Sequence, residues 1–206
     1  MTFEQKVNQA QIHLAKNDKI MAGLIDIAGD CTIKPHKDYY GELVNSIVSQ
    51  QLSAKAGGTI WRRVLALFDN KLPTPDQLIT VDAEAVRACG VSYPKIGYMK
   101  DLAQHIIDGR LDLDHVSTLS NDDLIKQLTA VKGIGDWSAH MFMIFSLGRL
   151  DILPVGDLGI KKSIMIMYGL KELPDKFIIE KVAAKNKWHP YESVASWYLW
   201  HSLDNK

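Results

Sequence analysis

The chain has 206 residues, of which 47% are hydrophobic and 23% are charged, the ordinary balance of a globular protein. No apolar run approaches the roughly 18 residues that span a bilayer, and the polar N-terminal stretch MTFEQKVNQAQIHLAKND lacks the apolar centre of a signal peptide. The formal net charge is zero, which disfavours nucleic-acid binding through bulk positive charge but leaves room for a local basic face. These observations predict a soluble intracellular protein that is not secreted.

Cys31 and Cys89 are the only cysteines of the chain. Two thiols cannot hold an iron–sulfur cluster or a four-cysteine zinc ion, so both are predicted to be small buried apolar residues. The seven histidines show neither HxxH nor HExxH spacing, and no catalytic metal is expected.

Helical spacing of apolar residues is clear from residue 39 onward. Between residues 39 and 52, apolar side chains recur every three or four positions, which is typical of one helix face. Ser53 is placed to cap a second helix that continues through AKAGGTIWRRVLALF. The Gly57–Gly58 pair is unfavourable inside that helix and predicts close packing or a bend.

The rest of the chain continues the helical pattern. Pro73 and Pro75 predict a loop, and Asp82 is expected to begin a short helix. Ser120 or Asn121 can cap a later helix. Further helices are expected over residues 94–108, 136–147, 157–168, 174–186 and 190–203. Because no alternating run of strand length occurs, the predicted fold class is all-α.

The segment LTAVKGIGDWSAHMFMIFSLG is the most informative part of the chain. One helix ends near Val131, a tight turn follows at Gly133, Ile134 and Gly135, and a second helix starts directly after it. Two glycines permit positive φ and let backbone N–H groups approach a phosphate, and the next helix N-terminus adds partial positive charge. Lys132 could supplement this anion site. The turn also fits a plain helix connection with a glycine C-cap.

The stretch VKGIGDWSA, followed about twenty residues later by LPVGDLGIKK, resembles the signature of the helix-hairpin-helix (HhH-GPD) DNA glycosylase superfamily. Within that superfamily the likeness is to the 3-methyladenine DNA glycosylase II branch, which acts in alkylation repair. Three more segments agree in the expected order: IVSQQLSAKAG at 47–57, WHPY at 188–191 and SWYLW at 196–200. The resemblance extends over residues 39–200.

The resemblance implies an all-α fold of two lobes. Residues 38–149 would form the lobe that carries the hairpin, and residues 1–37 with 150–206 would form a second helical lobe. The active site would lie in the cleft between them. The best-known bacterial relative has an additional N-terminal β-rich domain, and this chain is expected to lack one because it starts close to its first matching helix.

Asp157 follows Pro154-Val155-Gly156 and is placed to begin a helix. Aspartate is a favoured N-cap, so the position needs no catalytic explanation. The resemblance nevertheless places the family's catalytic aspartate here. The two roles are compatible, because a helix N-terminus favours a negatively charged side chain. Asp157 is therefore the predicted catalytic residue.

The implied activity is that of a monofunctional DNA glycosylase of base excision repair. It would hydrolyse the N-glycosidic bond of alkylated purines, of the 3-methyladenine and 7-methylguanine type, flipped out of double-stranded DNA. Sugar hydrolases with an oxocarbenium-like transition state usually need two carboxylates, one of them an acid for a poor leaving group. An N3- or N7-alkylated purine already carries positive charge, so one carboxylate can suffice to stabilise the sugar cation and position water.

Trp137 separates the chain from relatives that also cleave the DNA backbone. Those relatives carry a Schiff-base lysine two residues after the second hairpin glycine, where this chain has Trp137. Lys132, inside the hairpin, is at the wrong position to substitute. The missing cluster cysteines distinguish the chain from another branch. No AP lyase activity is expected.

The resemblance also assigns residues that contact the substrate. Trp137 and Trp200 match aromatic pocket positions, which suit a cationic purine, although Trp200 is also compatible with ordinary core packing. Met141 stands where the best-known members carry a tyrosine. Gln50 would lie at the pocket edge, and Gln51 would enter the gap left by the flipped nucleotide.

Ser138 and Lys161 are candidates for further phosphate contacts, and each is also compatible with a solvated polar position. The family's hairpin often holds a Na+ or K+ ion through backbone carbonyls, and the corresponding positions are Thr129, Val131 and Ile134. No other cofactor is implied.

Two alternatives remain open for the function. One is a non-catalytic paralogue that binds DNA through the hairpin, and the other is a glycosylase for other damaged bases. No motif indicates more than a monomer. The expected location is the cytoplasm, at the nucleoid, in a bacterium, or the nucleus in a eukaryote.

Overall fold

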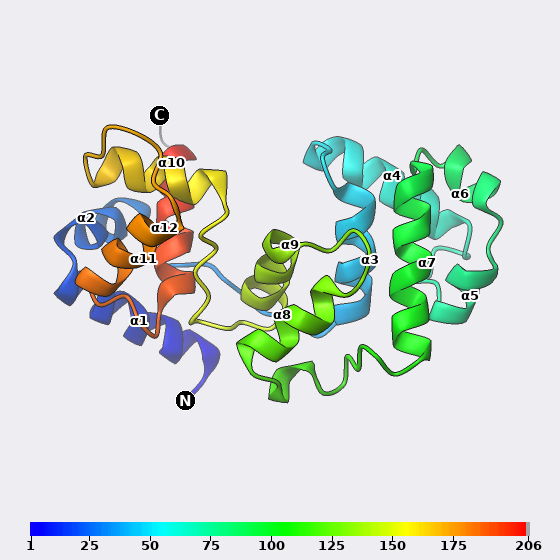
Figure 1. Ribbon diagram of the computed structural model, residues 1–206, viewed down its shortest axis with the longest axis horizontal. Coiled ribbons are helices and arrows are strands. Elements are labelled where there is room, and N and C mark those ends of the chain that lie inside the picture. The colour runs from blue at the N-terminus through cyan, green and yellow to red at the C-terminus, as the bar shows by residue number, and fades with distance from the viewer. Residues whose placement is uncertain (205–206) are drawn as a thin grey trace. The chain divides into compact units, whose positions relative to one another are not determined.

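The computed structural model describes residues 1–204, and every regular element within them is a helix, which confirms the all-α prediction. Contacts divide the chain into two compact units (Figure 1). The terminal unit contains residues 1–36 and the chain from residue 143 onward, and the central unit contains residues 37–142. The second boundary lies at residue 142 instead of 149. Within residues 1–204, no helix is long and apolar enough to cross a membrane.

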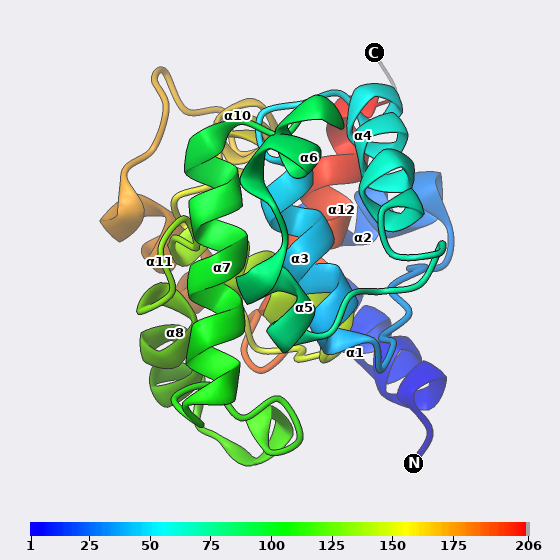
Figure 2. The ribbon, with the colours of Figure 1, turned by 90° about the vertical axis from the view of Figure 1, so that its right-hand side faces the viewer.

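The central unit is built around the long helix α7. Its helices are α3 (Tyr39–Ser49), α4 (Ala54–Ala66), α5 (Pro75–Thr80), α6 (Ala83–Ala88), α7 (Tyr93–Ile107), α8 (Asn121–Thr129) and α9 (Asp136–Met141), with a short 3-10 turn at Val116–Thr118. Helix α7 packs against α3, α5 and α6, as Figure 2 shows. Its buried stripe includes Ile96, Met99, Leu102 and Ala103, which recur at helical spacing.

Side-chain caps fix where these helices begin. Ser53 Oγ accepts the N–H of Ala56 at 3.3 Å at the start of α4, and Ser120 Oγ accepts the N–H of Asp123 at 3.1 Å at the start of α8. Asp82 caps α6 in the same way. These three predicted caps are confirmed. Each satisfies a backbone donor that has no partner within its own helix.

The prediction of a loop at Pro73 and Pro75 holds for Pro73 and is wrong for Pro75, because α5 begins there. Thr74 Oγ1 accepts the N–H of Gln77, and Gln77 Oε1 accepts the N–H of Thr74 at 2.8 Å, which together form a capping box. Pro75 occupies the first helical position, where its missing N–H removes no helical hydrogen bond. The prediction missed this helix start because two prolines within three residues are typical of a loop.

The helix expected over residues 136–147 is present, but only its first part is an α-helix. Helix α9 ends at Met141, and a π-helical turn continues over Phe142–Ser146.

The two adjacent glycines of α4 differ in how closely they are packed. Gly57 is buried, and a Cβ there would meet Ser49 Oγ at 2.8 Å, whereas a Cβ at Gly58 would meet nothing within 4 Å. Close packing is therefore confirmed for the first glycine alone.

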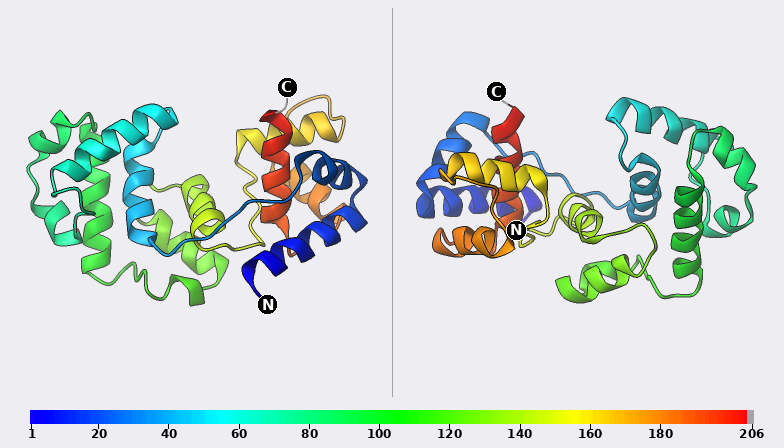
Figure 3. Two further views of the ribbon diagram at one scale, coloured as in Figure 1. Left: turned by 180° about the vertical axis from the view of Figure 1, so that it is seen from behind. Right: turned by 45° about the horizontal axis from the view of Figure 1, so that its top comes forward.

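The terminal unit surrounds helix α12. Its helices are α1 (Phe3–Asn17), α2 (Lys19–Ala28), α10 (Leu158–Met167), α11 (Lys176–Lys185) and α12 (Glu192–Asp204). Helix α12, red in Figures 1 and 3, packs against α1, α2 and α10. Trp188, Tyr198 and Leu199 from the WHPY and SWYLW segments are fully buried in this core.

A buried carboxylate, Asp18, holds the terminal unit together. Its side chain is almost fully enclosed, and Oδ1 accepts the N–H groups of Ile20 and Met21 at the start of α2. Oδ2 accepts the hydroxyl of Tyr168 at 2.5 Å and the indole N–H of Trp188 at 2.9 Å. A buried charge is tolerated when its lone pairs are satisfied in this way.

We expect Asp18→Ala to lower the free energy of unfolding by about 4 kcal/mol, because it removes a cap and leaves two buried donors without acceptors. Urea denaturation would measure the change. The matched control is Asp175→Ala, which removes an exposed N-cap that accepts the N–H of Ile178 at 2.9 Å. That change should lower stability by only about 1 kcal/mol. Equal losses would contradict the role given to Asp18.

Candidate active site and hairpin

Asp157 is the N-cap of α10, as the sequence predicts. Its Oδ1 accepts the N–H of Ile160 at 2.8 Å. The approach to the helix is a tight turn, in which the N–H of Asp157 donates to the carbonyl of Pro154 at 2.9 Å. The side chain is half-buried. The cap therefore fixes the carboxylate at the positive end of the helix while part of it remains accessible.

Trp200 contacts this carboxylate directly. Its indole Nε1–H donates to Asp157 Oδ1 at 2.9 Å, from α12, which packs against α10. A single oxygen thus accepts two N–H donors from two helices. Trp200 is half-buried, so it is not an ordinary residue of the core. It orients the carboxylate.

Gly159 makes this contact possible, and the sequence prediction overlooked it. A Cβ at Gly159 would lie 3.0 Å from both Asp157 Oδ1 and Trp200 Cδ1. The signal in the sequence was a glycine in the first turn of a helix, where its low helix propensity calls for a packing reason. The missing side chain lets the indole lie against the start of α10.

Phe145 adds a second aromatic ring beside Trp200. The two ring centroids are 5.8 Å apart and the rings are tilted by 32°. Phe145 is 37% exposed, although large apolar side chains are usually enclosed. Within the terminal unit, Trp200 therefore contacts the carboxylate of Asp157 and Phe145 lies beside Trp200. Lys161 lies one helical turn after Asp157 and is half-buried.

The hairpin between α8 and α9 depends on Gly133, which has a φ of +84°. A Cβ there would also collide with the ring of Tyr98 on α7. Gly135 differs, because its φ is −100° and a Cβ would meet nothing within 4 Å. The N–H of Ile134 donates to the carbonyl of Val131 at 3.1 Å, which closes the turn. The first glycine is required for the turn itself, and the second is exposed beside it.

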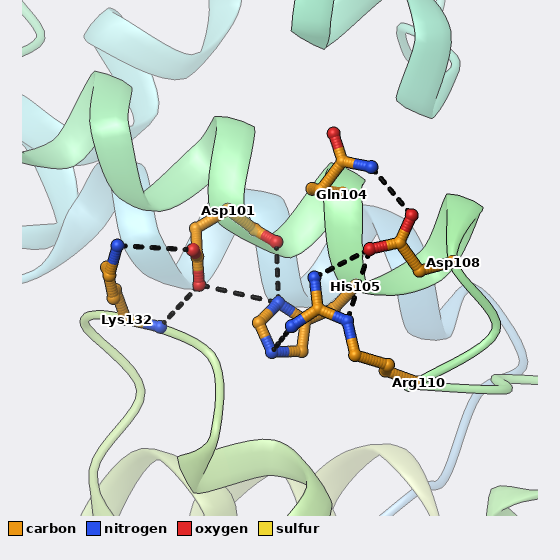
Figure 4. Close-up of polar contacts among 6 residues, drawn as sticks. All are labelled: Asp101, Gln104, His105, Asp108, Arg110 and Lys132. Carbon is orange, nitrogen blue, oxygen red and sulfur yellow. Dashed lines mark hydrogen bonds and ion pairs between the residues drawn. The ribbon is translucent and has the colours of Figure 1, made fainter.

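Asp101 on α7 contacts the hairpin through Lys132 (Figure 4). Its Oδ2 accepts the backbone N–H of Lys132 at 2.8 Å, and the Lys132 ammonium lies 3.7 Å from its Oδ1. The Lys132 side chain is 77% exposed, so this ion pair is weak and leaves the ammonium available to a phosphate. The backbone N–H of Lys132, in contrast, is committed to Asp101.

Buried His105 extends the same network. Its Nδ1 lies 2.9 Å from the carbonyl of Asp101, and its Nε2 lies 2.9 Å from a guanidinium nitrogen of Arg110 (Figure 4). Arginine can only donate, so Nε2 accepts and the proton sits on Nδ1. Arg110 also donates to Asp108 at 2.8 Å. Arg110, just after the end of α7, is therefore linked through His105 to Asp101, the residue that contacts the hairpin.

Gln50 is brought to the hairpin from 83 positions earlier in the chain. Its Nε2 donates to the carbonyl of Gly133 at 2.8 Å. The neighbouring Gln51 is exposed and has a φ of +59°. The two glutamines therefore differ: one is bound to the hairpin, and the other projects from the same loop.

The remaining predicted binding residues of the central unit lie on α9. Trp137 is 53% exposed, and Met141 and Ser138 are half-buried. Trp137 and Met141 are four positions apart and share one side of the helix. Asp157, Lys161 and Trp200 belong to the terminal unit.

Thr129, Val131 and Ile134 delimit the predicted alkali-ion turn. Val131 and Ile134 are buried, and the carbonyl of Val131 accepts one N–H, which leaves it a second lone pair for a cation. Thr129 ends α8, and its hydroxyl donates to the carbonyl of Ile125 at 2.8 Å. The turn thus contains carbonyl oxygens of the chemistry that an alkali ion requires, and the ion itself stays a prediction.

Side-chain metal ligation receives no support within residues 1–204, where no group of three or more His, Cys, Asp or Glu residues could hold a metal ion. Burial raises the pKa of the Cys31 thiol to about 11 and raises that of Cys89 above its ordinary value. In both cases burial favours the protonated thiol over the thiolate. Cys89 is buried as predicted, whereas Cys31 is only partly enclosed.

An all-α fold in which a glycine hairpin joins two helices is that of a helix-hairpin-helix protein. Comparison with known proteins agrees. The chain belongs to the HhH-GPD superfamily of base excision DNA repair proteins, whose family model matches residues 44–188.

The similarity to individual relatives extends over nearly the whole chain. DNA-3-methyladenine glycosylase 1 of Schizosaccharomyces pombe is 35% identical over 201 residues, covering 94% of this chain and 86% of the relative. A structure of the S. pombe 3-methyladenine DNA glycosylase in complex with abasic DNA aligns with a TM-score of 0.83 at 34% identity, covering 95% of this chain and 97% of that one. A DNA-3-methyladenine glycosidase of Bacillus halodurans aligns with a TM-score of 0.83 at 41% identity, covering 93% and 88%.

The two hairpin glycines should respond differently to substitution. We expect Gly133→Ala to lower the free energy of unfolding by about 2 kcal/mol or more, because alanine disfavours positive φ and would collide with Tyr98. Gly135→Ala should change it by no more than about 0.5 kcal/mol. Urea denaturation of both variants would measure this. A larger loss for Gly135→Ala would contradict the geometry described for the turn.

Proposed function

We propose that this chain is a monofunctional DNA glycosylase that hydrolyses the N-glycosidic bond of alkylated purines in double-stranded DNA. The observation that carries the proposal is the carboxylate of Asp157, fixed at the start of α10 by the N–H groups of Ile160 and Trp200. Family membership and relatives named as 3-methyladenine DNA glycosylases support the substrate class.

Asp157 is the proposed catalytic residue. Departure of the base leaves an oxocarbenium-like sugar, and a nearby carboxylate stabilises that cation. Both N–H donors bind Oδ1, so the orientation of the carboxylate is set before substrate arrives. A fixed charge is more effective in catalysis than one that must reorganise. The same carboxylate would position or activate the water that attacks the sugar.

A second acid is unnecessary for an N3- or N7-alkylated purine, which leaves as a neutral base after starting as a cation. Electron-rich aromatic faces attract such a cation. Trp200 and Phe145 in the terminal unit, and Trp137 in the central unit, each present an exposed or half-buried ring, and each is proposed separately as an aromatic contact of the flipped base. Met141 shares the side of α9 that carries Trp137 and would contribute a polarisable thioether to it.

The proposed reaction ends at the abasic site. Backbone cleavage through a Schiff base needs an amine at the position of Trp137, and an indole cannot form one. Lys132 lies in the hairpin, where its ammonium is 3.7 Å from Asp101 and its backbone supports the turn. The product is therefore a DNA strand that has lost a base and remains uncut.

The hairpin is the proposed DNA anchor. Exposed Gly133 and Gly135, with the accessible ammonium of Lys132, suit a phosphate group. Ser138 and Lys161 are proposed as further phosphate contacts. A relative solved in complex with abasic DNA supports double-stranded DNA as the partner. The chain would act as a monomer wherever DNA is kept, at a nucleoid or in a nucleus.

The proposal is tested by base release from methylated duplex DNA, measured by chromatography. The native protein should release 3-methyladenine or 7-methylguanine and leave uncut abasic strands. Asp157→Asn keeps the cap geometry but removes the charge, and should reduce release at least a hundredfold while duplex binding is retained.

The matched control is Asp175→Asn, which makes the same change at the N-cap of α11. Release by this control should equal that of the native protein. Near-native release by Asp157→Asn would remove Asp157 from the mechanism. DNA binding by the native protein without any base release would favour a non-catalytic hairpin protein, and release confined to oxidised or mismatched bases would favour the other glycosylase class.

Trp200→Phe should lower base release roughly tenfold or more, because it keeps an aromatic ring but removes the N–H that orients Asp157. Trp188→Phe is the control, since it also removes an indole donor from an aspartate, in that case the structural Asp18. That variant should lose thermal stability but little release per folded molecule. If the two variants lose activity equally after correction for folding, the orienting role of Trp200 is wrong.

A further inference from the structure

Gln51 adopts a backbone conformation that is unfavourable for its residue type. Its φ of +59° lies in the left-handed region, which residues with a Cβ rarely occupy. The N–H of Leu52 donates to the carbonyl of Ser49 at 3.1 Å, so the loop between α3 and α4 reverses tightly around this residue. Such strain persists only where the surroundings hold it in place, and it concentrates at ligand-binding sites.

Lys95 restrains this loop from α7. Its ammonium reaches from α7 and donates to the carbonyl of Val48 at 2.9 Å and to that of Gln50 at 2.7 Å. These carbonyls lie at the C-terminus of α3, where backbone acceptors lack helical partners and the helix dipole is negative. The side chain is half-buried, and burial lowers the pKa of Lys95 below its ordinary value. One cation thus fixes the residue directly before Gln51.

The same side of α7 also holds the hairpin. Lys95, Tyr98 and Asp101 are spaced three positions apart. Tyr98 lies under Gly133, and Asp101 accepts the N–H of Lys132 at 2.8 Å. The loop also contacts the hairpin directly, because Gln50 Nε2 donates to the carbonyl of Gly133 at 2.8 Å.

We propose that Lys95 is a positioning residue for base flipping, which fixes the loop at residues 49–53 so that Gln51 is presented in a set position relative to the hairpin. The inference rests on the proposed function. The resemblance places Gln51 in the gap left by the flipped base, and a loop that is already fixed would present Gln51 there as soon as the hairpin binds the DNA backbone. The entropic cost of ordering the loop is then met during folding, so it does not reduce the free energy of DNA binding.

A purely structural role makes a different prediction. Lysines that cap a helix end through carbonyls occur without any link to function, and Lys100 on the same helix is an example. Its ammonium donates to the carbonyl of Val81, at the end of α5, at 3.0 Å. Lys95→Met and Lys100→Met are therefore matched variants, because each removes a carbonyl-capping ammonium from α7 and keeps an unbranched chain of similar length.

The first measurement is single-turnover release of 7-methylguanine from two duplexes, one with the lesion paired to cytosine and one with it inside a mismatched bubble. An unpaired base needs less help to leave the stack. Lys95→Met should lose roughly tenfold on the paired substrate and no more than about twofold in the bubble, given the strength of hydrogen bonds from a charged donor. Lys100→Met should lose equally on both, in line with its folded fraction.

The second measurement is a double-mutant cycle with Gln51→Ala. If Lys95 acts through Gln51, adding Lys95→Met to Gln51→Ala should cause little further loss on the paired duplex. Additive losses, or equal losses of Lys95→Met on both duplexes, would overturn the positioning role.

Base flipping can also be followed without chemistry, by fluorescence of a 2-aminopurine next to an abasic analogue in the duplex. Binding of the native protein should raise the signal, and Lys95→Met and Gln51→Ala should both reduce that rise several-fold, whereas Lys100→Met should not. A native-like rise for Lys95→Met contradicts the inference even if no base is ever released. Absence of base release with the expected fluorescence pattern would contradict the proposed catalytic function alone.

Discussion

The contact on which the site depends is the one in which a single oxygen of Asp157 accepts two N–H donors. One donor is the backbone of Ile160 in the same helix, and the other is the indole of Trp200 in α12. The first places the carboxylate, and the second sets its rotation. The contact also requires that Gly159 carry no side chain. The residues that begin α10 therefore also determine the geometry of the site. The cap and the catalytic interpretation of Asp157 therefore describe the same arrangement.

Aspartates organise the rest of the protein in a similar way. Asp18 joins the start of α2 to Tyr168 and Trp188, and Asp101 joins α7 to the hairpin through Lys132. Asp18 accepts two backbone N–H groups and Asp101 accepts one, and each also faces a side-chain donor or cation from a distant segment. A carboxylate can accept several hydrogen bonds at once, which makes it suited to such junctions.

The sequence predicted the features that depend on neighbouring residues. Apolar spacing predicted most helices, and Ser53, Asp82 and Asp157 were identified as caps because a cap and its partner are three positions or fewer apart. The start of α5 was missed because two nearby prolines indicate a loop more strongly than a capping box indicates a helix. The family and its hairpin were identified because their motifs are local, and the comparison with known proteins confirms them.

What escaped prediction depends on contacts between distant segments. Gly159 matters because of Trp200, 41 positions away in the printed sequence, and Lys95 matters because of carbonyls 45 and 47 positions earlier. A lysine in an amphipathic helix has the same local pattern whether it faces solvent or caps another helix. Only the packing of α7 against α3 distinguishes the two.

A chain without net charge is an unusual partner for a polyanion, and the hairpin suggests how the difficulty is met. The carboxylate of Asp101 is turned toward the hairpin, where it accepts the backbone N–H of Lys132 at 2.8 Å. Gly133 and Gly135 are both exposed, and in the proposed function their backbone N–H groups would bind a phosphate through directed hydrogen bonds. Recognition that depends on directed donors requires an accurately placed turn more than a large positive field. The contacts that Tyr98, Asp101 and Gln50 make with the hairpin fit that requirement, since each restrains the turn and none adds positive charge.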